Sequence, residues 1–278
     1  MPSINVSEIN FFKMQGSGND FIVIDNNKLR LSPQEMPNLA QKLCPRGFAV
    51  GADGMIFLED SPDADLDFVW HFFNSDGSRA EMCGNGSRCA SLLAFKIGLA
   101  GKNHVFGTDA GPVKAGILDS GLVKVQLTPA RDMRQHIVVD YQGQSYNVFF
   151  VNTGVPHAVI IFDDVSQVDV PAFGRFIRMH EEFAPAGTNV NFIEITSNNS
   201  IKLRTYERGV EAETHACGTG AAAAAAIANV QKLVESSVEV TTTGGETLII
   251  DLEGEDIFLS GKAQIVYKGQ VDTDFLRI

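Results

Sequence analysis

Short apolar runs, and runs in which apolar and polar residues alternate, recur along the chain at lengths typical of β-strands. They occupy residues 20–25, 66–73, 113–118, 122–127, 146–151, 157–162, 190–196, 201–206, 246–251 and 263–268. A period of two places alternate side chains on opposite faces of a sheet, and four to eight residues is the usual strand length. The chain is therefore predicted to be rich in β-structure.

Two segments have a different pattern, because they are apolar around nearly the whole helical circumference. These are CASLLAFKIGLA at 89–100 and GAAAAAAIANV at 220–230. Such composition is typical of a buried helix, whereas an amphipathic stripe marks a surface helix. Residues 31–43 and 171–179 are the predicted surface helices. Two buried helices among many short strands predict an α+β fold, in which a curved, mostly antiparallel sheet wraps around a central helix.

The chain repeats a Cys-Gly-x-Gly motif, first at Cys83 and again at Cys217, 134 residues later (217 − 83 = 134). The same shift places VKVQL at 123–127 on IFLSG at 257–261. Near the start of each half, Gly16 aligns with Gly154. A repeated order of motifs indicates a duplicated structural unit.

The repeat predicts two pseudo-symmetric domains. We expect an N-terminal domain over residues 1–130, completed by the last strand at about 269–278, and a C-terminal domain over residues 131–268. The joint is expected near residues 128–140.

Composition excludes several partners. The 278 residues have a formal net charge of −12, and no run of Lys or Arg forms the positive surface that nucleic acids or anionic membranes require. The N-terminus lacks the features of a signal peptide. The longest apolar run, Ala221 to Ala228, is far shorter than the roughly 20 residues of a membrane span. We therefore expect a cytoplasmic protein whose cysteines are thiols rather than disulfides.

A cysteine at the start of a helix can transfer protons. The first turn of a helix carries unpaired N–H groups and the positive end of the macrodipole, which favour the thiolate. The glycines of each motif expose these amides to a ligand carboxylate. If the duplicated domains face each other, one thiolate can remove a proton from carbon while the other thiol supplies one on the opposite face. That chemistry inverts a stereocentre and needs no cofactor or metal.

The four cysteines allow other interpretations. Cys44 and Cys89 lack the glycine turn and are expected in the core, because cysteine is commonly a small buried hydrophobe. A zinc site is disfavoured because no CxxC occurs, and HEEFA at 180–184 lacks the second histidine of HExxH. A redox-sensing thiol pair, Cys83 with Cys217, stays open as a non-catalytic alternative.

A dinucleotide site is the other rival. Residues 218–223 satisfy G-x-G-x-x-A, and Glu239 lies 21 residues beyond Gly218. However, residues 207–216 separate this motif from the preceding strand, whereas the fingerprint needs a tight strand-to-helix turn.

The two cysteine motifs belong to a set of segments spread over the chain, which are GSGNDF at 16–21, GADG at 51–54, FNSDGSRAEMCGNGSRC at 73–89, PHAV at 156–159, GTNVNF at 187–192 and YERGVEAETHACGTG at 206–220. In these segments the sequence resembles the diaminopimelate epimerases, cofactor-independent enzymes that interconvert LL- and meso-diaminopimelate on the path to lysine and peptidoglycan. Proline racemases and hydroxyproline epimerases are similar around their cysteines, but their first turn typically reads CGHG. A racemase of another amino acid is thus the nearest competing function.

The resemblance implies roles for individual residues, together with a homodimer, a small-molecule substrate and no cofactor. Cys83 and Cys217 would be the acid–base pair, and His157 would support the protonation of a cysteine. Two departures, Val155 and Gly54, suggest an altered substrate range. The implied substrate-binding residues are Asn19, Asn74, Gly84, Asn85, Asn189, Glu207, Arg208, Gly218 and Thr219.

Overall fold

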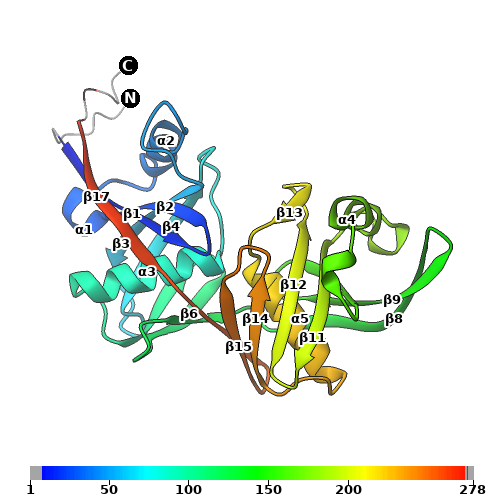
Figure 1. Ribbon diagram of the computed structural model, residues 1–278. Coiled ribbons are helices and arrows are strands. Elements are labelled where there is room, and N and C mark those ends of the chain that lie inside the picture. The colour runs from blue at the N-terminus through cyan, green and yellow to red at the C-terminus, as the bar shows by residue number, and fades with distance from the viewer. Residues whose placement is uncertain (1–7, 273, 275–278) are drawn as a thin grey trace. The chain divides into compact units, whose positions relative to one another are not determined.

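The computed structural model of the protein describes residues 8–272 and residue 274. These residues form two compact units. Unit 1 contains the described residues up to Val125 together with those from Lys262 onward, and unit 2 contains Gln126–Gly261. Most of their helices and strands are labelled in Figure 1.

Unit 1 is built on a row of eight strands in which neighbours in the row are hydrogen-bonded. The strand that completes it, β17, comes from the far end of the sequence and pairs with β1. In order along the row the strands are β17 (Gln264–Asp272), β1 (Glu8–Gly16), β2 (Asn19–Asp25), β3 (Gly54–Asp60), β4 (Phe68–Asn74), β5 (Asn103–Thr108), β6 (Gly111–Ile117) and β7 (Val123–Leu127).

Unit 2 has an equivalent row of eight strands and one short additional strand, β13 (Ala212–Thr214), which pairs with β12. In order the strands are β8 (Arg131–Tyr141), β9 (Gln144–Asn152), β10 (Pro156–Ile161), β11 (Asn189–Ser197), β12 (Ser200–Glu207), β14 (Ser237–Thr242), β15 (Thr247–Glu253) and β16 (Asp256–Gly261).

The two rows share one pattern of strand directions. In unit 1 the third and fifth pairings, β2–β3 and β4–β5, are parallel and the others are antiparallel. In unit 2 the third and fifth pairings are again parallel, between β10 and β11 and between β12 and β14. Each row is therefore a mixed, mostly antiparallel sheet, and the predicted α+β class is confirmed.

Each sheet curves around one helix that begins immediately after a Cys-Gly-x-Gly cysteine. In unit 1, α3 (Gly84–Ile97) packs on β1, β2, β3, β6 and β17. In unit 2, α5 (Gly218–Val230) packs on β9, β10, β11, β12, β14, β15 and β16 (Figure 1). Residues 86–94 of α3 and 220–228 of α5 are buried. The apolar composition predicts this for α5 and for most of α3, whereas Ser87, Arg88 and Ser91 of α3 are buried polar residues.

A second helix covers the other face of each sheet. α2 (Met36–Leu43) packs on β3 and β4, and α4 (Val170–Arg178) packs on β11 and β12. The amphipathic α4 buries Phe173 and Ile177 against a cluster that includes Phe192. The shorter helical segments are α1 (Asn26–Leu29), η1 (Val165–Gln167) and η2 (Glu181–Phe183).

The structure confirms the predicted strands and corrects the ends of the helices. α3 begins five residues before the predicted range and ends at Ile97, because Gly98 adopts a left-handed conformation with φ of 78° and caps it. α2 begins at Met36 rather than residue 31. The strands β1, β3, β5, β8, β13, β14 and β16 were not among the predicted runs. Part of the last predicted strand, at residues 273 and 275–278, lies outside the described residues.

Candidate functional site

Cys83 is the N-cap of α3, placed there because its extended backbone (φ −151°, ψ 118°) precedes the first helical residue. Its Sγ accepts a hydrogen bond from the Gly86 amide at 3.5 Å. The side chain is half-buried. A sulfur in this position lies at the positive end of the helix dipole, which stabilises the thiolate.

Cys217 occupies the same position in unit 2, as the N-cap of α5. Its Sγ accepts a hydrogen bond from the Gly220 amide at 3.4 Å and lies 3.5 Å from the Thr219 hydroxyl. The residue is buried, with 8% of its surface exposed. The duplicated motif therefore gives two cysteines with the same capping geometry, one in each unit.

The amides that follow each cysteine are positioned to bind an anion. Gly84 and Asn85 begin α3, and Gly218 and Thr219 begin α5, so their N–H groups belong to a first helical turn that has no intrahelical acceptor. In unit 2 the buried Thr153 hydroxyl donates to the Thr219 carbonyl at 2.9 Å, which ties this turn to the end of β9. A carboxylate is the ligand that such a turn favours.

Asn19, the first residue of β2, contacts the Cys83 sulfur. The thiol donates to Asn19 Oδ1 at 3.7 Å, and Asn19 Nδ2 donates to Asp53 Oδ2 at 2.6 Å. Arg46 donates to the other oxygen of Asp53 at 2.8 Å and also binds Asp20. The amide is thus held between a sulfur and a network of charged groups.

Arg88 is fully buried within α3, five residues after Cys83. Its guanidinium donates to Ser17 Oγ at 2.6 Å, Asn85 Oδ1 at 2.9 Å and the Lys262 carbonyl at 3.3 Å. One side chain therefore connects the β1–β2 turn, the first turn of α3 and the segment before β17. It fixes the position of the amides beside Cys83.

His157 is fully buried in β10, and burial lowers its pKa to about 3, with a further contribution from Arg208. Asn191 Nδ2 donates to His157 Nδ1 at 3.0 Å, so the neutral ring carries its proton on Nε2. That nitrogen is buried and has no hydrogen-bond partner among the described residues. His157 is consequently neutral at physiological pH and can act only as a donor through Nε2.

Asn189, Glu207 and Arg208 lie together where β11 begins and β12 ends. Asn189 Oδ1 accepts from the Arg208 amide at 2.8 Å, and the Arg208 guanidinium donates to the Ala186 carbonyl at 3.1 Å. Burial raises the pKa of Glu207. The structure thus places a cation and an anion at one end of the unit 2 sheet.

The remaining predicted residue of unit 1, Asn74, is exposed at the end of β4, where its side chain donates to Ser78 Oγ at 3.0 Å. In unit 1 the predicted residues are Asn19, Asn74, Cys83, Gly84 and Asn85. In unit 2 they are His157, Asn189, Glu207, Arg208, Cys217, Gly218 and Thr219.

The two other cysteines are core residues. Cys44 follows α2 and Cys89 lies within α3, and both are buried. Burial raises the pKa of each to about 12. This confirms that they are placed as hydrophobes, because neither thiol ionises near neutral pH.

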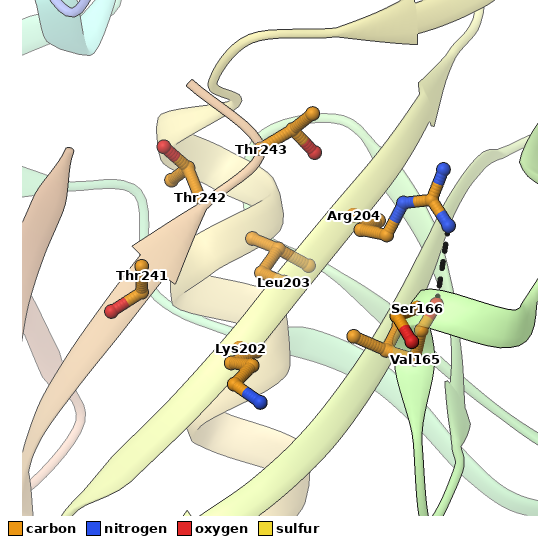
Figure 2. A pocket seen from close by; sticks show the side chains of 8 residues that line it. All are labelled: Val165, Ser166, Lys202, Leu203, Arg204, Thr241, Thr242 and Thr243. Atoms are coloured by element: carbon orange, nitrogen blue, oxygen red, sulfur yellow. Dashed lines mark hydrogen bonds between the residues drawn. The ribbon is translucent and has the colours of Figure 1, made fainter. Parts of the chain in front are cut away.

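A pocket of about 350 Å³ lies over β12 and β14 in unit 2 (Figure 2). None of the predicted site residues lines it. Its two cations already have partners, since Lys202 pairs with Glu194 at 2.7 Å and Arg204 pairs with Glu213 at 2.7 Å. The pocket therefore offers an anionic ligand no uncompensated charge.

Within residues 8–272 and 274, no cluster of three or more His, Cys, Asp or Glu side chains is suited to hold a metal ion. No helix in the described part of the chain is long and apolar enough to cross a membrane.

Sequence reasoning missed Asp53, Arg88, Thr153 and Asn191. Three of them stand inside segments quoted for the family resemblance, Asp53 in GADG, Arg88 in FNSDGSRAEMCGNGSRC and Asn191 in GTNVNF. A charged residue beside an apolar helical segment was the available signal for Arg88. Thr153 carries no comparable signal.

The comparisons with known proteins agree with the motifs. A profile described as "Diaminopimelate epimerase" matches residues 11–133 and 149–266. The chain is 48% identical over 271 residues to a diaminopimelate epimerase of Hydrogenobaculum sp. (strain Y04AAS1), covering 93% of this chain and 97% of the relative. It is 46% identical over 277 residues to one of Aquifex aeolicus (strain VF5), covering 96% and 99%.

Solved structures share the fold at low identity. A phenazine biosynthesis protein of Bacillus anthracis matches with a TM-score of 0.70 and 17% identity, covering 96% of this chain and 99% of that one. A hydroxyproline epimerase of Agrobacterium vitis matches with a TM-score of 0.67 and 14% identity, covering 96% and 93%. The resemblance inferred from the motifs is confirmed, and the chain belongs to the diaminopimelate epimerase family.

Proposed function

We propose that the protein interconverts LL- and meso-diaminopimelate by moving a proton at one α-carbon, as a step of lysine and peptidoglycan precursor synthesis. The observation that carries the proposal is the matched pair of cysteine N-caps, Cys83 on α3 and Cys217 on α5. Each sulfur accepts a hydrogen bond from the amide of the glycine three residues after it, Gly86 or Gly220. Two equivalent acid–base groups are what inversion of a carbon centre requires.

The proposed reaction uses one cysteine as thiolate and the other as thiol. The thiolate removes the α-proton, and the electron pair of the C–H bond moves into the adjacent carboxylate. The second thiol then donates its proton to the opposite face of the carbon. In the reverse direction the two cysteines exchange roles, so the chemistry needs no cofactor.

The first helical turns would bind the carboxylate at the reacting carbon. The amides of Gly84, Asn85, Gly218 and Thr219 lie beside the two sulfurs, at the positive ends of α3 and α5. Negative charge increases on the carboxylate as the proton leaves. Fixed N–H donors therefore stabilise the transition state more than the ground state.

The distal end of the substrate would be bound by the charged groups of unit 2. Arg208 offers a planar guanidinium suited to a carboxylate, and Glu207 offers a carboxylate suited to an ammonium group. Asn189 holds the Arg208 backbone at 2.8 Å. Asn19 and Asn74 would complete recognition from unit 1. Family membership further supports a cytoplasmic homodimer.

Hydrogen exchange in deuterated water tests the proposal. Incubation with LL-diaminopimelate under reducing conditions should give meso product with deuterium at the inverted α-carbon, whereas proline and hydroxyproline should not exchange. Cys83→Ala and Cys217→Ala should each reduce turnover by about 10²–10⁴-fold. Cys44→Ala, which removes a core thiol, is the matched control and should retain activity.

Two outcomes would contradict this function. Absence of exchange with every diaminopimelate isomer would exclude the epimerase, and efficient exchange with proline would favour the competing racemase. A non-catalytic redox-sensing role makes a different prediction, because its response needs both sulfurs but no turnover of diaminopimelate.

A further inference from the structure

The hydrogen bond between Cys83 and Asn19 has a defined direction. Asn19 Oδ1 lies 3.7 Å from the sulfur, and an amide oxygen can only accept. The sulfur must therefore donate, which it can do only as a thiol. A hydrogen bond made by the neutral form of an acid stabilises that form over the ionised one.

Asp53 prevents the Asn19 amide from turning over. Its carboxylate Oδ2 lies 2.6 Å from Asn19 Nδ2 and also accepts from the Asp20 amide at 3.1 Å. A carboxylate can only accept, so it holds the amide NH₂ toward itself and leaves Oδ1 directed at the sulfur. If the amide rotated, its NH₂ would face the sulfur and would favour the thiolate instead.

The orientation of Asp53 is itself fixed by charged neighbours. Arg46 donates to Asp53 Oδ1 at 2.8 Å, and the Asp53 amide donates to Asp20 Oδ1 at 3.2 Å. Lys13, with 9% of its side chain exposed, pairs with Asp20 at 2.7 Å. Two cations thus match two carboxylates, which makes the network rigid.

In unit 2 the position that matches Asn19 carries a histidine. Asn19 stands three residues after Gly16, and the residue three positions after Gly154 is His157. The Gly220 amide donates to the Cys217 sulfur, and the Thr219 hydroxyl, 3.5 Å away, can donate as well. The Asn19 acceptor therefore favours a thiol at Cys83, whereas these two donors favour a thiolate at Cys217.

The charged and titratable groups around Cys83 come from several elements of unit 1. Lys13 on β1, Asp20 on β2, and Arg46 and Asp53 on the loop before β3 belong to the network above. Arg88 on α3 lies beneath the first turn, where it contacts Gly84 and Asn85. Glu81 precedes the cysteine by two residues and is exposed. Of these groups, Asp53 is the one that bonds to the side chain touching the sulfur.

We propose that Asp53 is a positioning residue that keeps Cys83 protonated at rest by fixing the Asn19 amide, so that Cys83 begins the cycle as the acid. The role of Cys83 as the acid rests on the proposed epimerase function, whereas its protonation at rest does not. The proton stays on Cys83 until it is transferred to the α-carbon. The Gly86 amide, 3.5 Å from the sulfur, then stabilises the thiolate that is left.

The test measures the pKa of Cys83 without substrate. The rate of carbamidomethylation by iodoacetamide is followed from pH 6 to 10 and assigned to Cys83 by peptide mass spectrometry, in a Cys217→Ala background. Asn19→Ala, Asp53→Ala and the double variant are compared with that background. Asp76→Ala, which removes an exposed aspartate of the same unit, is the matched control.

Asn19→Ala and Asp53→Ala should each lower the pKa of Cys83, raising the thiolate fraction at pH 7 about two- to tenfold, the usual effect of one hydrogen bond. In the Asn19→Ala background, removal of Asp53 should have no further effect, because Asp53 acts through the amide. Asp76→Ala should leave the profile unchanged. Asn19→Ala alone tests the acceptor if Asp53→Ala fails to fold.

If the double variant lowered the pKa of Cys83 by the sum of the two single effects, Asp53 would act by its charge alone, and the proposal would be overturned. An unchanged or raised pKa in Asn19→Ala would overturn it as well. Because the alkylation assay uses no substrate, these failures are distinct from failure of the deuterium exchange experiment, which tests the epimerase function.

Discussion

Asn191 fills the space in which a side chain on Gly220 would lie. A Cβ atom at Gly220 would approach Asn191 Oδ1 more closely than real Cβ atoms do, and would lie 3.3 Å from the Cys217 sulfur. Asn191 cannot move away easily, because it is buried and bonded to His157, the Ala158 carbonyl and Thr205, each at 3.0 Å. The second glycine of this motif is therefore required by packing.

The paired glycine substitutions should consequently differ. Gly220→Ala should destabilise the protein by about 1–3 kcal/mol through overpacking and should reduce activity, since Asn191 and His157 must shift. Gly86→Ala places its Cβ 3.3 Å from Ile56 Cδ1, a flexible neighbour, and should change stability by less than about 1 kcal/mol. Urea unfolding followed by circular dichroism measures both. Equal losses in the two variants would contradict this asymmetry.

The two glycine motifs show what sequence reasoning could and could not predict. The repeat located both N-caps, because a cysteine followed by glycines at the start of an apolar run is a local signal. The sequence predicted only part of the reason why position 220 is a glycine. It predicted that glycine exposes the amides to a ligand. It could not predict that Asn191 occupies the space of a side chain at position 220, because this contact between β11 and α5 is not encoded by a local pattern.

Arg88 should be essential for the stability of unit 1. Arg88→Met nearly keeps the volume but removes the donors to Ser17 Oγ, Asn85 Oδ1 and the Lys262 carbonyl, which should cost about 2–4 kcal/mol. Fluorescence of Trp70, the only tryptophan of the chain, reports urea unfolding of this unit. Arg79→Met is the control, because Arg79 pairs with Asp109 at the surface and should contribute less than about 1 kcal/mol. If Arg88→Met lost less stability than Arg79→Met, Arg88 would not have this stabilising role.

The sequence indicated the elements better than their polar contacts. Strands such as β7 were found because their buried and half-buried positions alternate. The strand β1 was missed, although its residues alternate similarly at several positions, because EINFFKMQG carries a lysine that is buried by pairing with Asp20. Networks such as that of Asp53 join residues 33 or 34 positions apart and appear only after folding.

The core cysteines should resist modification in the folded protein. Burial raises the pKa of Cys44 and Cys89 to about 12, so at pH 8 their thiolate fraction is negligible. Iodoacetamide at pH 8 should label neither of them in the native state, and should label all four cysteines in urea. Peptide mass spectrometry gives the sites. If Cys44 in the native protein were labelled as fast as Cys83, Cys44 would be more accessible than its burial in the structure indicates.

Glu207 should make substrate binding sensitive to acid. In the proposed site it would bind the ammonium group only as a carboxylate. Because burial raises its pKa, binding should weaken at a higher pH than for an ordinary glutamate, whose pKa is about 4.3. KM for diaminopimelate should therefore rise as pH falls from 8 to 5, with a smaller change in kcat. Glu207→Gln should have a high KM throughout and lose this pH dependence. The exposed Glu239→Gln should behave as the parent protein.

His157 should contribute to acid denaturation of unit 2. Its pKa is about 3 in the folded state, against about 6.5 in an unfolded chain, so between these values the unfolded state binds more protons. The stability provided by the neutral ring is therefore complete above pH 6.5 and is lost as pH falls toward 3. Between pH 7 and pH 4.5 this loss should be about 2–3 kcal/mol.

His157→Gln removes the titrating ring but leaves a polar side chain beside Asn191. The variant should be less stable than the parent at pH 7, because a packed ring is lost, yet its stability should fall less steeply between pH 7 and pH 4.5. Urea unfolding followed by circular dichroism at several pH values gives the slope of the free energy of unfolding against pH. His215→Gln, at an exposed position of the same unit, should leave this slope unchanged. A slope equal to that of the parent would mean that His157 is not buried as a neutral ring, since a ring that ionises alike in both states adds nothing to the pH dependence.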